Sequence, residues 1–492
     1  MTAESSTSLD DSTSLLNTLV PTIVGLVLFV VNFDITAIVM VMPLVKQDLA
    51  LDVGGFAWLM DSYSIALTAF LLSAGILADR FGRRMMLLGG DAIFLLASLQ
   101  CAFAGAQTSL IIGRVGQGIG AAFMMSSGLA IIGNRYTNTA SRARAFAWTG
   151  TMAGVATALG PAGGGLIADL LGWHWVFLIN IPICLFIAIT ATIVVDESRD
   201  PAKRKIDLRG IATLSALLLS VVWLLLHGAR ISTFEIPSWL AILWVLALFI
   251  AFWSTQRFGT QPLIELDMFS SRTFVGFCLV PVALSVAYWA VLIYLPLFLQ
   301  ERLGRSFSDA WVLMLAATMP MVALPMFSAR IALAMEARVF FGAGLLIVSI
   351  GAFVMAAAAQ MQHLVMGLIG MAIAGCANGA LNPQLTARIV GSVRREQAGA
   401  ASAISVILRQ GGFSIGIAMF GAVMRTSLEQ PSLILTGINV FATIFAIAAI
   451  AAVVGSAAVF TLIGLHSSDR ELPSPAAVSV MDDDSERKAM SE

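Results

Sequence analysis

Five charged side chains lie well inside long apolar runs of this 492-residue chain: Asp34, Asp61, Asp91, Arg114 and Arg409. A charge at the middle of a bilayer costs roughly 3 kcal/mol on insertion scales, so each should face the interior of a helix bundle or a water-filled cavity. Carboxylates in such places can take up and release protons, and guanidinium groups can pair with them or contact a substrate. The predicted chemistry is therefore proton and substrate binding inside a membrane.

The depth of three of these charges follows from counting residues from the ends of their helices. Asp34, in the stretch FVVNFDITAIVM, lies about ten residues below the outer surface, whereas Asp61 lies about five below it. Arg114 lies level with Asp61, so we expect these two to interact directly or through water, with Asp34 nearer the cavity centre. A nearby arginine favours an ionised carboxylate and desolvation disfavours it. An acid that loses and regains its partner can therefore load and release a proton.

Each embedded charge also has a structural interpretation. Asp34 and Asp61 can serve in helix–helix hydrogen bonds, although we favour substrate and proton binding for both. Asp91 lies about six residues from the cytoplasmic end of its run, which favours a structural ion pair with one of three nearby arginines, Arg80, Arg83 or Arg84. Arg409 either balances an acid or contacts substrate, and the sequence does not choose between these roles.

Aromatic residues near the predicted site include Trp58 and Tyr63. Their rings can hold an organic cation by cation–π attraction, typically about 1 kcal/mol. Tryptophan and tyrosine also gather at membrane interfaces, so anchoring and packing are the more ordinary roles for either residue.

Apolar runs long enough to cross a bilayer as helices position these charges. Fourteen are expected, at about 19–44, 56–78, 85–106, 109–133, 144–169, 174–195, 210–227, 238–256, 273–299, 309–329, 339–359, 363–385, 397–424 and 437–464. An even number places both termini on one side. Loops on that side carry most of the Lys and Arg residues, so the positive-inside rule predicts that both termini are cytoplasmic.

The loops divide the predicted all-α integral membrane fold into two six-helix bundles with an inserted pair of helices. We expect a cytoplasmic N-terminal tail at 1–18, a first bundle at 19–195, a cytoplasmic linker with two inserted helices at 196–272, a second bundle at 273–464 and a disordered cytoplasmic tail at 465–492. Paired bundles suit alternating access to a central site.

Composition excludes several classes of function. The chain is 59% apolar and only 12% charged, with a net charge of −1, so nothing recommends a nucleic-acid partner. The four cysteines lie in apolar runs without metal-ligand spacing, and we expect them to be reduced and buried. No phosphate-binding loop or hydrolase motif occurs in the sequence. We therefore expect no enzyme, no cofactor and no metal site, and an ion gradient as the energy source.

The loop after the second run reads GILADRFGRR, with Gly75, Asp79, Arg80, Gly82 and Arg83 at characteristic spacing. Its small residues allow two helices to approach closely, and its charges can exchange ion pairs at a cytoplasmic seam. This loop resembles the GxLaDrxGrk gating loop of the major facilitator superfamily.

Other stretches resemble the same family. The segment AGVATALGPAGGGLI is similar to its antiporter motif, in which Gly154, Gly160, Pro161 and Gly164 bend the fifth helix and permit close, shifting contacts. GRVGQGIGAAFM places Arg114 inside the fourth run, and GWHWVFLINIPI resembles the signature that opens the sixth helix. The match covers the first half densely and the second half less well. The whole resembles the fourteen-helix drug:proton antiporters of the EmrB and QacA type.

That resemblance implies a major facilitator fold and proton-driven export from a bacterial inner membrane. It supports substrate and proton binding at Asp34 and Asp61, and the depth of the charges suggests that Arg114 takes part in proton coupling beside Asp61. We expect lipophilic organic cations, such as quaternary ammonium compounds, dyes and antiseptics, to be the substrates, because such a cation would displace a proton from either acid. The alternatives are export of an endogenous metabolite or antibiotic by the same antiport and, less favoured, a non-transporting receptor. The expected partners are small hydrophobic substrates, protons and lipid, with the chain working as a monomer.

Overall fold

The computed structural model describes residues 4–51, 53–136, 139–199, 208–227, 238–258, 266–394, 397–429 and 439–464, which form helices and the loops between them. The predicted C-terminal tail at 465–492 lies outside the described residues, as does part of the linker that follows the first bundle. The predicted domain boundaries stay predictions.

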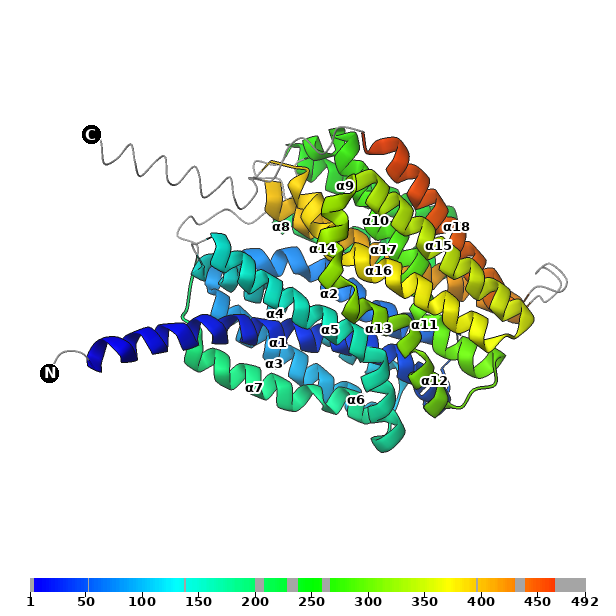
Figure 1. Cartoon of the computed structure of the whole chain (residues 1–492), viewed down its shortest axis with the longest axis horizontal. Coiled ribbons are helices and arrows are strands. Elements are labelled where there is room, and N and C mark those ends of the chain that lie inside the picture. The colour runs from blue at the N-terminus through cyan, green and yellow to red at the C-terminus, as the bar shows by residue number, and fades with distance from the viewer. Residues whose placement is uncertain are drawn as a thin grey trace.

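The first bundle contains seven helices in chain order (Figure 1): α1 (Glu4–Asp48), α2 (Val53–Phe81), α3 (Arg83–Ala102), α4 (Gln107–Arg135), α5 (Thr139–Leu171), α6 (His174–Leu178) and α7 (Asn180–Val194). Helix α1 extends into the predicted N-terminal tail, which the sequence analysis places before a span starting at residue 19. The predicted sixth span is interrupted at Ile179, between α6 and α7.

The second bundle contains more interruptions. Its first span joins α10 (Arg272–Leu284), the π-helical turn η3 (Ser285–Trp289), α11 (Ala290–Leu297) and a second π-helical turn, η4 (Phe298–Arg302), and it follows the short helix η2 (Leu266–Ser270). Its second span is divided into α12 (Phe307–Leu313), α13 (Leu315–Ala323) and α14 (Pro325–Ala334). Four longer helices complete it: α15 (Ala337–Met361), α16 (Leu364–Gly391), α17 (Ala398–Glu429) and α18 (Val440–Leu462).

Two helices stand between the bundles in sequence, α8 (Leu208–His227) and α9 (Ser238–Phe258). They pack on each other, and α8 also contacts α2 of the first bundle and α17 of the second. The Ser215 hydroxyl of α8 donates a hydrogen bond of 2.8 Å to the Ala69 carbonyl of α2. Large apolar side chains on α9 are exposed, including Trp239 and Trp244 at 60% each. Helix α8 therefore lies at a seam between the bundles, and α9 exposes an apolar surface.

Length and composition identify eleven described helices able to cross a membrane. A twelfth span results if the pair Trp58–Leu71 and Ser73–Phe81, bent by 48°, is one crossing. Two shorter apolar helices, Ala212–Val221 and Phe307–Ala323, fall where the sequence predicts the seventh and tenth spans. The number fourteen stays a prediction, but the chain is an all-helical, multi-pass membrane protein.

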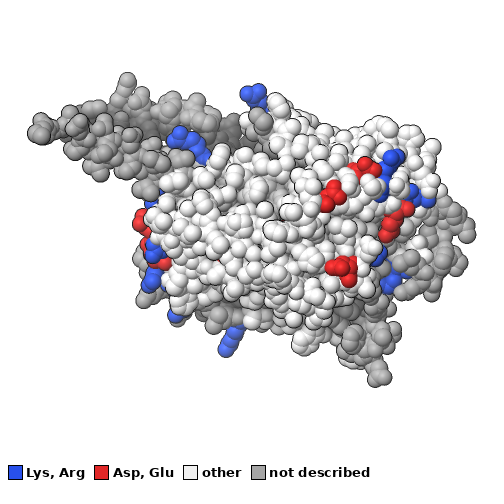
Figure 2. All heavy atoms as spheres, turned by 90° about the horizontal axis from the view of Figure 1, so that it is seen from below, with Lys and Arg blue, Asp and Glu red and all other residues white. Residues whose placement is uncertain are grey.

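The distribution of charge on the surface agrees with this conclusion. On the face shown in Figure 2, most described Lys, Arg, Asp and Glu side chains lie toward the two ends, a few basic side chains project at the upper and lower edges, and a broad zone between the ends is uncharged. Exposed apolar side chains occur on nearly every long helix. Of the cysteines, Cys101, Cys184 and Cys278 are buried as expected, whereas Cys376 is exposed, and all four are free thiols.

Within each bundle, one helix pair is held together by reciprocal glycines. A Cβ atom on Gly90 of α3 would lie 2.8 Å from the Gly120 carbonyl oxygen of α4, and one on Gly120 would lie 2.7 Å from the Gly90 carbonyl oxygen. Gly351 of α15 and Gly370 of α16 repeat this arrangement, with 2.8 Å in both directions. Since any side chain larger than hydrogen would collide, glycine sets the helix separation at both seams.

Candidate functional site

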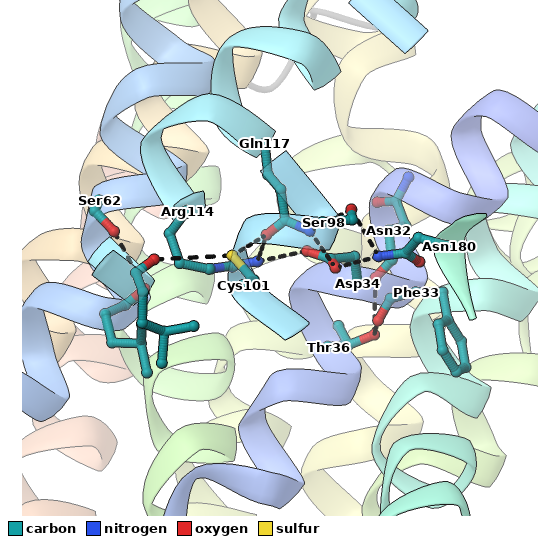
Figure 3. A network of polar contacts seen from close by, with 12 residues as sticks. Asn32, Phe33, Asp34, Thr36, Ser62, Ser98, Cys101, Arg114, Gln117 and Asn180 are labelled. Carbon is teal, nitrogen blue, oxygen red and sulfur yellow. Dashed lines mark hydrogen bonds and ion pairs between the residues drawn. The ribbon is translucent and has the colours of Figure 1, made fainter. Parts of the chain in front are cut away.

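A buried polar network surrounds Asp34 at the middle of the first bundle (Figure 3). Oδ2 of Asp34 forms an ion pair with Nη1 of Arg114. Its Oδ1 accepts hydrogen bonds from Nε2 of Gln117 at 3.0 Å and from Nδ2 of Asn180 at 2.8 Å. Asp34 and Arg114 are each only 1% exposed. Three donors thus converge on one carboxylate, which stabilises its negative charge.

Four helices bring these groups together. Asp34 lies on α1, while Arg114 and Gln117 lie one turn apart on α4 and therefore share a face of that helix. Asn180 is the first residue of α7, directly after the break at Ile179. The remaining member, Ser98 of α3, accepts a hydrogen bond of 2.9 Å from Nε2 of Gln117. The site is built entirely within the first bundle.

Arg114 is also in contact with Tyr63, a residue that the sequence analysis groups with possible substrate contacts. The guanidinium carbon of Arg114 lies 4.4 Å from the centroid of the Tyr63 ring. Tyr63 is fully buried on α2. Its ring therefore packs on an internal cation.

The predicted direct contact between Arg114 and Asp61 is not found among the described residues, because the structure pairs Arg114 with Asp34. Asp61 is 0% exposed on α2 and lies near the Ser414 hydroxyl of α17 in the second bundle. Neither oxygen of its carboxyl has a hydrogen-bond partner within the described part of the chain. Asp61 thus lies in a contact between the bundles, whereas Asp34 lies inside one of them.

The other embedded acid, Asp91 of α3, also departs from its predicted contact. It is 1% exposed and lies against the Cys184 thiol of α7. Among the described residues it forms no ion pair with the arginines of the loop before α3. The reason is that the buried face of α3, which carries Asp91, packs against α4 and α7 and turns away from that loop.

A cavity of about 630 Å³ lies between the two bundles. Its wall from the first bundle comes mainly from α1 and α5, and its wall from the second comes from η3, α11, α13, α16 and α17. Arg409 lines it, whereas neither Asp34 nor Asp61 does. A volume of this size is in the range of sites that bind small molecules.

The end of the molecule where α1 finishes at Asp48, here called the far side, is closed by contacts between the bundles. Lys46 of α1 forms an ion pair of 3.8 Å with Glu301 of η4. Asp169 of α5 accepts hydrogen bonds from Ser308 at 2.8 Å and from Nε1 of Trp311 at 3.4 Å, both on α12. The cavity residues on α5, α16 and α17 lie toward the opposite ends of those helices, here called the tail side. This conformation therefore blocks the far side.

The predicted gating loop is held by the chain that follows α7. Asp79 accepts two hydrogen bonds from Arg83, at 3.0 and 2.8 Å. The Glu197 carboxylate accepts hydrogen bonds of 3.1 Å from the backbone N–H groups of Arg84 and Met85, at the start of α3. Gly82 has a φ of 126°, and a Cβ there would lie 2.6 Å from the Glu197 carboxyl group. The contact between this loop and Glu197 therefore requires glycine at this position. A Cβ on Gly75 would lie 2.9 Å from Oγ of Ser126, showing close approach of α2 and α4.

The residues of the predicted antiporter motif lie on α5 with Pro161 inside the helix. Cβ atoms on Gly160 and Gly164 would collide with Thr36 and Ala37 of α1, whereas one on Gly154 would meet no atom within 4 Å. Gly154 instead lines the cavity. Within the motif, Gly160 and Gly164 therefore pack against α1, while Gly154 faces the cavity.

Sequence reasoning missed several members of these contacts. Gln117 could have been predicted from the sequence, since it lies three residues after Arg114 on the same helix face. Asn180 is an amide in an otherwise apolar stretch, but its role depends on the break before α7. Nothing local pairs Asp169 with Ser308, because they are 139 residues apart in the chain. Trp58, the remaining candidate, is partly buried against the core.

Comparison with known proteins places the chain among transporters. The model of the family described as Major Facilitator Superfamily matches residues 24–417. The chain is 29% identical over 411 residues to the multidrug transporter protein MdtP of Bacillus subtilis, covering 82% of this chain and 75% of that protein. It is 28% identical over 431 residues to the methylenomycin A resistance protein of the same organism, covering 86% and 91%. It is 27% identical over 407 residues to the multidrug resistance protein Stp of Mycobacterium tuberculosis, covering 82% and 75%.

Solved structures show the same architecture. A D-xylose–proton symporter aligns with a TM-score of 0.64 at 14% identity, covering 91% of this chain and 98% of that one. A POT family transporter in complex with 5-aminolevulinic acid aligns with a TM-score of 0.65 at 12% identity, covering 90% and 95%. At these identities the likeness concerns the fold alone.

Proposed function

The chain belongs to the major facilitator superfamily, and from that premise we propose that it exports small hydrophobic, drug-like molecules in exchange for protons. It is a transporter and not an enzyme. The observation that carries the proposal is the central cavity, closed on the far side and lying beside a buried, ionisable pair. The names of its relatives, which include multidrug transporter and resistance proteins, support drug efflux.

Asp34 is the proposed proton-binding residue. In the conformation described, three donors stabilise its charge, so proton uptake requires that some of these contacts loosen. Rearrangement of α1 against α4 during alternation would do this, since Arg114 and Gln117 both belong to α4. Asp61 is a second proposed proton- or substrate-binding group, which becomes accessible only when α2 and α17 separate. Arg114 couples protonation to the arrangement of helices.

The proposed orientation places the tail side in the cytoplasm of a bacterium and the far side outside the inner membrane, following the positive-inside rule. The cavity then receives substrate from the cytoplasm or the inner leaflet. The gating loop around Asp79 and Arg83 and the α1–α5 glycine contact are proposed to govern the switch between conformations. Membership in the fourteen-helix EmrB and QacA branch belongs to this proposal, with α8 and α9 as the inserted helices.

The predicted preference for lipophilic cations rests on Asp34 and Asp61, and it stays a prediction. The alternative, a narrow exporter of one antibiotic or metabolite, is supported by the similarity to a protein named for methylenomycin A resistance. Resistance profiling of cells expressing the chain separates the two, because broad resistance to cationic dyes and antiseptics supports the first and a single-compound profile the second.

The test of proton-coupled export uses inside-out membrane vesicles and the wild-type protein beside Asp34→Asn, at matched expression. We expect an imposed pH gradient to drive substrate uptake by the wild type and not by the variant. Exchange of labelled for unlabelled substrate without a gradient should persist in the variant, since the cavity residues are unchanged. Gradient-driven uptake at the wild-type rate in Asp34→Asn would exclude Asp34 as the coupling acid.

A further inference from the structure

The wall of the cavity carries one positive charge that is not neutralised by the described part of the chain. Among the described residues that line the cavity, Arg409 of α17 is the only charged one. Within the described residues its guanidinium group has no ion pair and no hydrogen bond. Arg409 is partly buried, and a cation without a partner at this depth is costly, so it favours a ligand that supplies the opposite charge.

Three more polar side chains on the same wall have unpaired atoms. Nε1 of Trp289 and Oγ of Ser285, both on η3, have no hydrogen-bond partner in the part of the chain that is described, and neither does the amide of Asn378 on α16. Indole N–H groups and guanidinium groups can only donate hydrogen bonds, whereas hydroxyl and amide groups can both donate and accept them. Ser285 and Asn378 are 0% exposed, so their unused donors lie behind the surface of the cavity, whereas Arg409 is a partly exposed donor on this wall.

The wall from the first bundle differs. Its hydroxyl groups donate within their own helices: Thr36 to the Asn32 carbonyl at 2.8 Å, Thr151 to Ala147 at 2.9 Å and Thr157 to Ala153 at 2.8 Å. The Asn32 amide likewise donates to the Leu28 carbonyl at 2.7 Å. These groups offer few donors to a ligand, and the intervening residues are small or apolar. The cavity thus has one donor-rich side and one less polar side.

We propose that this cavity binds amphiphilic molecules that carry a carboxylate, with the acidic group on Arg409 and the apolar body against α1 and α5. A carboxylate accepts paired hydrogen bonds from guanidinium and can accept others from the neighbouring donors. An organic cation in the same cavity would meet Arg409 and no acid on the described wall. The proposal rests on the proposed export function and reverses the sign of charge expected from the sequence.

The test measures binding to the purified full-length protein with three anthracene probes that share one ring system. They are 9-anthroate, its neutral carboxamide and anthracen-9-ylmethyl trimethylammonium, each measured by equilibrium dialysis against a matched detergent blank. In the wild type we expect the carboxylate to bind at least about tenfold more tightly than the ammonium compound. Arg409→Gln should weaken carboxylate binding about tenfold or more and change carboxamide binding less than about twofold.

Two further variants make the result specific. Arg409→Lys keeps the charge without the paired geometry and should weaken carboxylate binding less than Arg409→Gln does. Arg425→Gln removes a guanidinium group from the same helix outside the cavity and should leave all three affinities unchanged. Gel filtration and thermal unfolding identify folded variants, and the lysine variant supplies the comparison if the glutamine variant does not fold.

Two results would overturn the proposal. In the first, the ammonium probe binds the wild type as tightly as the carboxylate does. In the second, Arg409→Gln is folded and weakens the binding of all three probes to the same extent. Because binding requires no gradient, carboxylate binding without proton-driven uptake would refute the export function and leave this site standing. Gradient-driven export of cations alone would support the export function and refute the carboxylate site.

Discussion

At the scale of single residues, the main feature is an ion pair removed from both water and lipid. Asp34 and Arg114 have side chains 0% and 1% exposed, respectively. Such a pair gains little over apolar residues of similar volume, because desolvation offsets the attraction. Breaking it is expensive, since one charge then stays buried without its partner. Its presence is therefore better explained by function than by stability.

The difference between removing one charge of the pair and replacing both gives a stability prediction. Asp34→Leu and Arg114→Met should each lower the free energy of unfolding by about 3–5 kcal/mol, whereas the double variant should lose less than either single one. The measurement is denaturation of purified protein in detergent. As a control, Lys46→Met breaks a pair whose side chains are 36% and 47% exposed, and it should cost less than about 1 kcal/mol. Additive losses in the double variant would show that the two charges do not interact.

The sequence locates the embedded charges but not their partners. Counting residues gives depth along a helix axis, and at that level Arg114 and Asp61 look like neighbours. It does not give the direction in which a residue faces, and a long arginine side chain can reach a different depth from its Cα. Because Arg114 shares a face with Gln117, and that face meets α1 rather than Asp61, the true partner is Asp34.

At the scale of helices, glycines on α5 set its distance from α1. A Cβ on Gly164 would lie 2.7 Å from both the Cβ and the carbonyl oxygen of Ala37. Ten residues earlier on the same helix, Gly154 has open space beside it. The two positions thus form a natural comparison within one motif.

Gly164→Ala should lower the unfolding temperature, because α1 must shift to admit the added methyl group. Gly154→Ala should leave it unchanged or raise it, since alanine favours helix by up to about 1 kcal/mol and meets no obstacle. Fluorescence-detected thermal unfolding in detergent compares the two variants. Equal destabilisation by both would mean that helix contact at Gly164 does not decide the effect.

Apolar length predicts where helices occur but not where they break. The sequence predicts single spans at 174–195, 273–299 and 309–329, yet the structure divides the first at Ile179, inserts π-helical turns η3 and η4 in the second and breaks the third at Met314 and Leu324. Prolines near these positions indicate that the helices can be interrupted there. Helix α6, which ends at the first break, packs against α1 and α3, which are distant from it in sequence, and the local sequence does not contain such contacts.

At the scale of the whole molecule, contacts between the two bundles close the far side. The contacts of Asp169 with Ser308 and Trp311 join α5 to α12, and the ion pair of Lys46 with Glu301 joins α1 to η4. The sequence predicts a division into two bundles, but it does not predict which side is closed. That depends on contacts between residues more than a hundred positions apart.

A disulfide across this closure should stop transport. The substitutions Asp169→Cys and Ser308→Cys, combined with Cys376→Ala to remove the exposed thiol, place two cysteines at a contact of 2.8 Å between the original side chains. After oxidation we expect uptake into vesicles to fall at least about tenfold and a reductant to restore it. Each single cysteine variant is the control. Unchanged uptake by fully cross-linked protein would show that the far side need not open.

The reciprocal glycines of α3 with α4 and of α15 with α16 have a mechanical consequence. A side chain at any of these four positions would collide with the facing backbone, so a substitution there must push the two helices of the pair apart. The interrupted spans, α6 with α7 and α12 to α14, and the π-helical turns belong to other helices of the same bundles. Each bundle therefore combines a closely packed pair of continuous helices with at least one interrupted span.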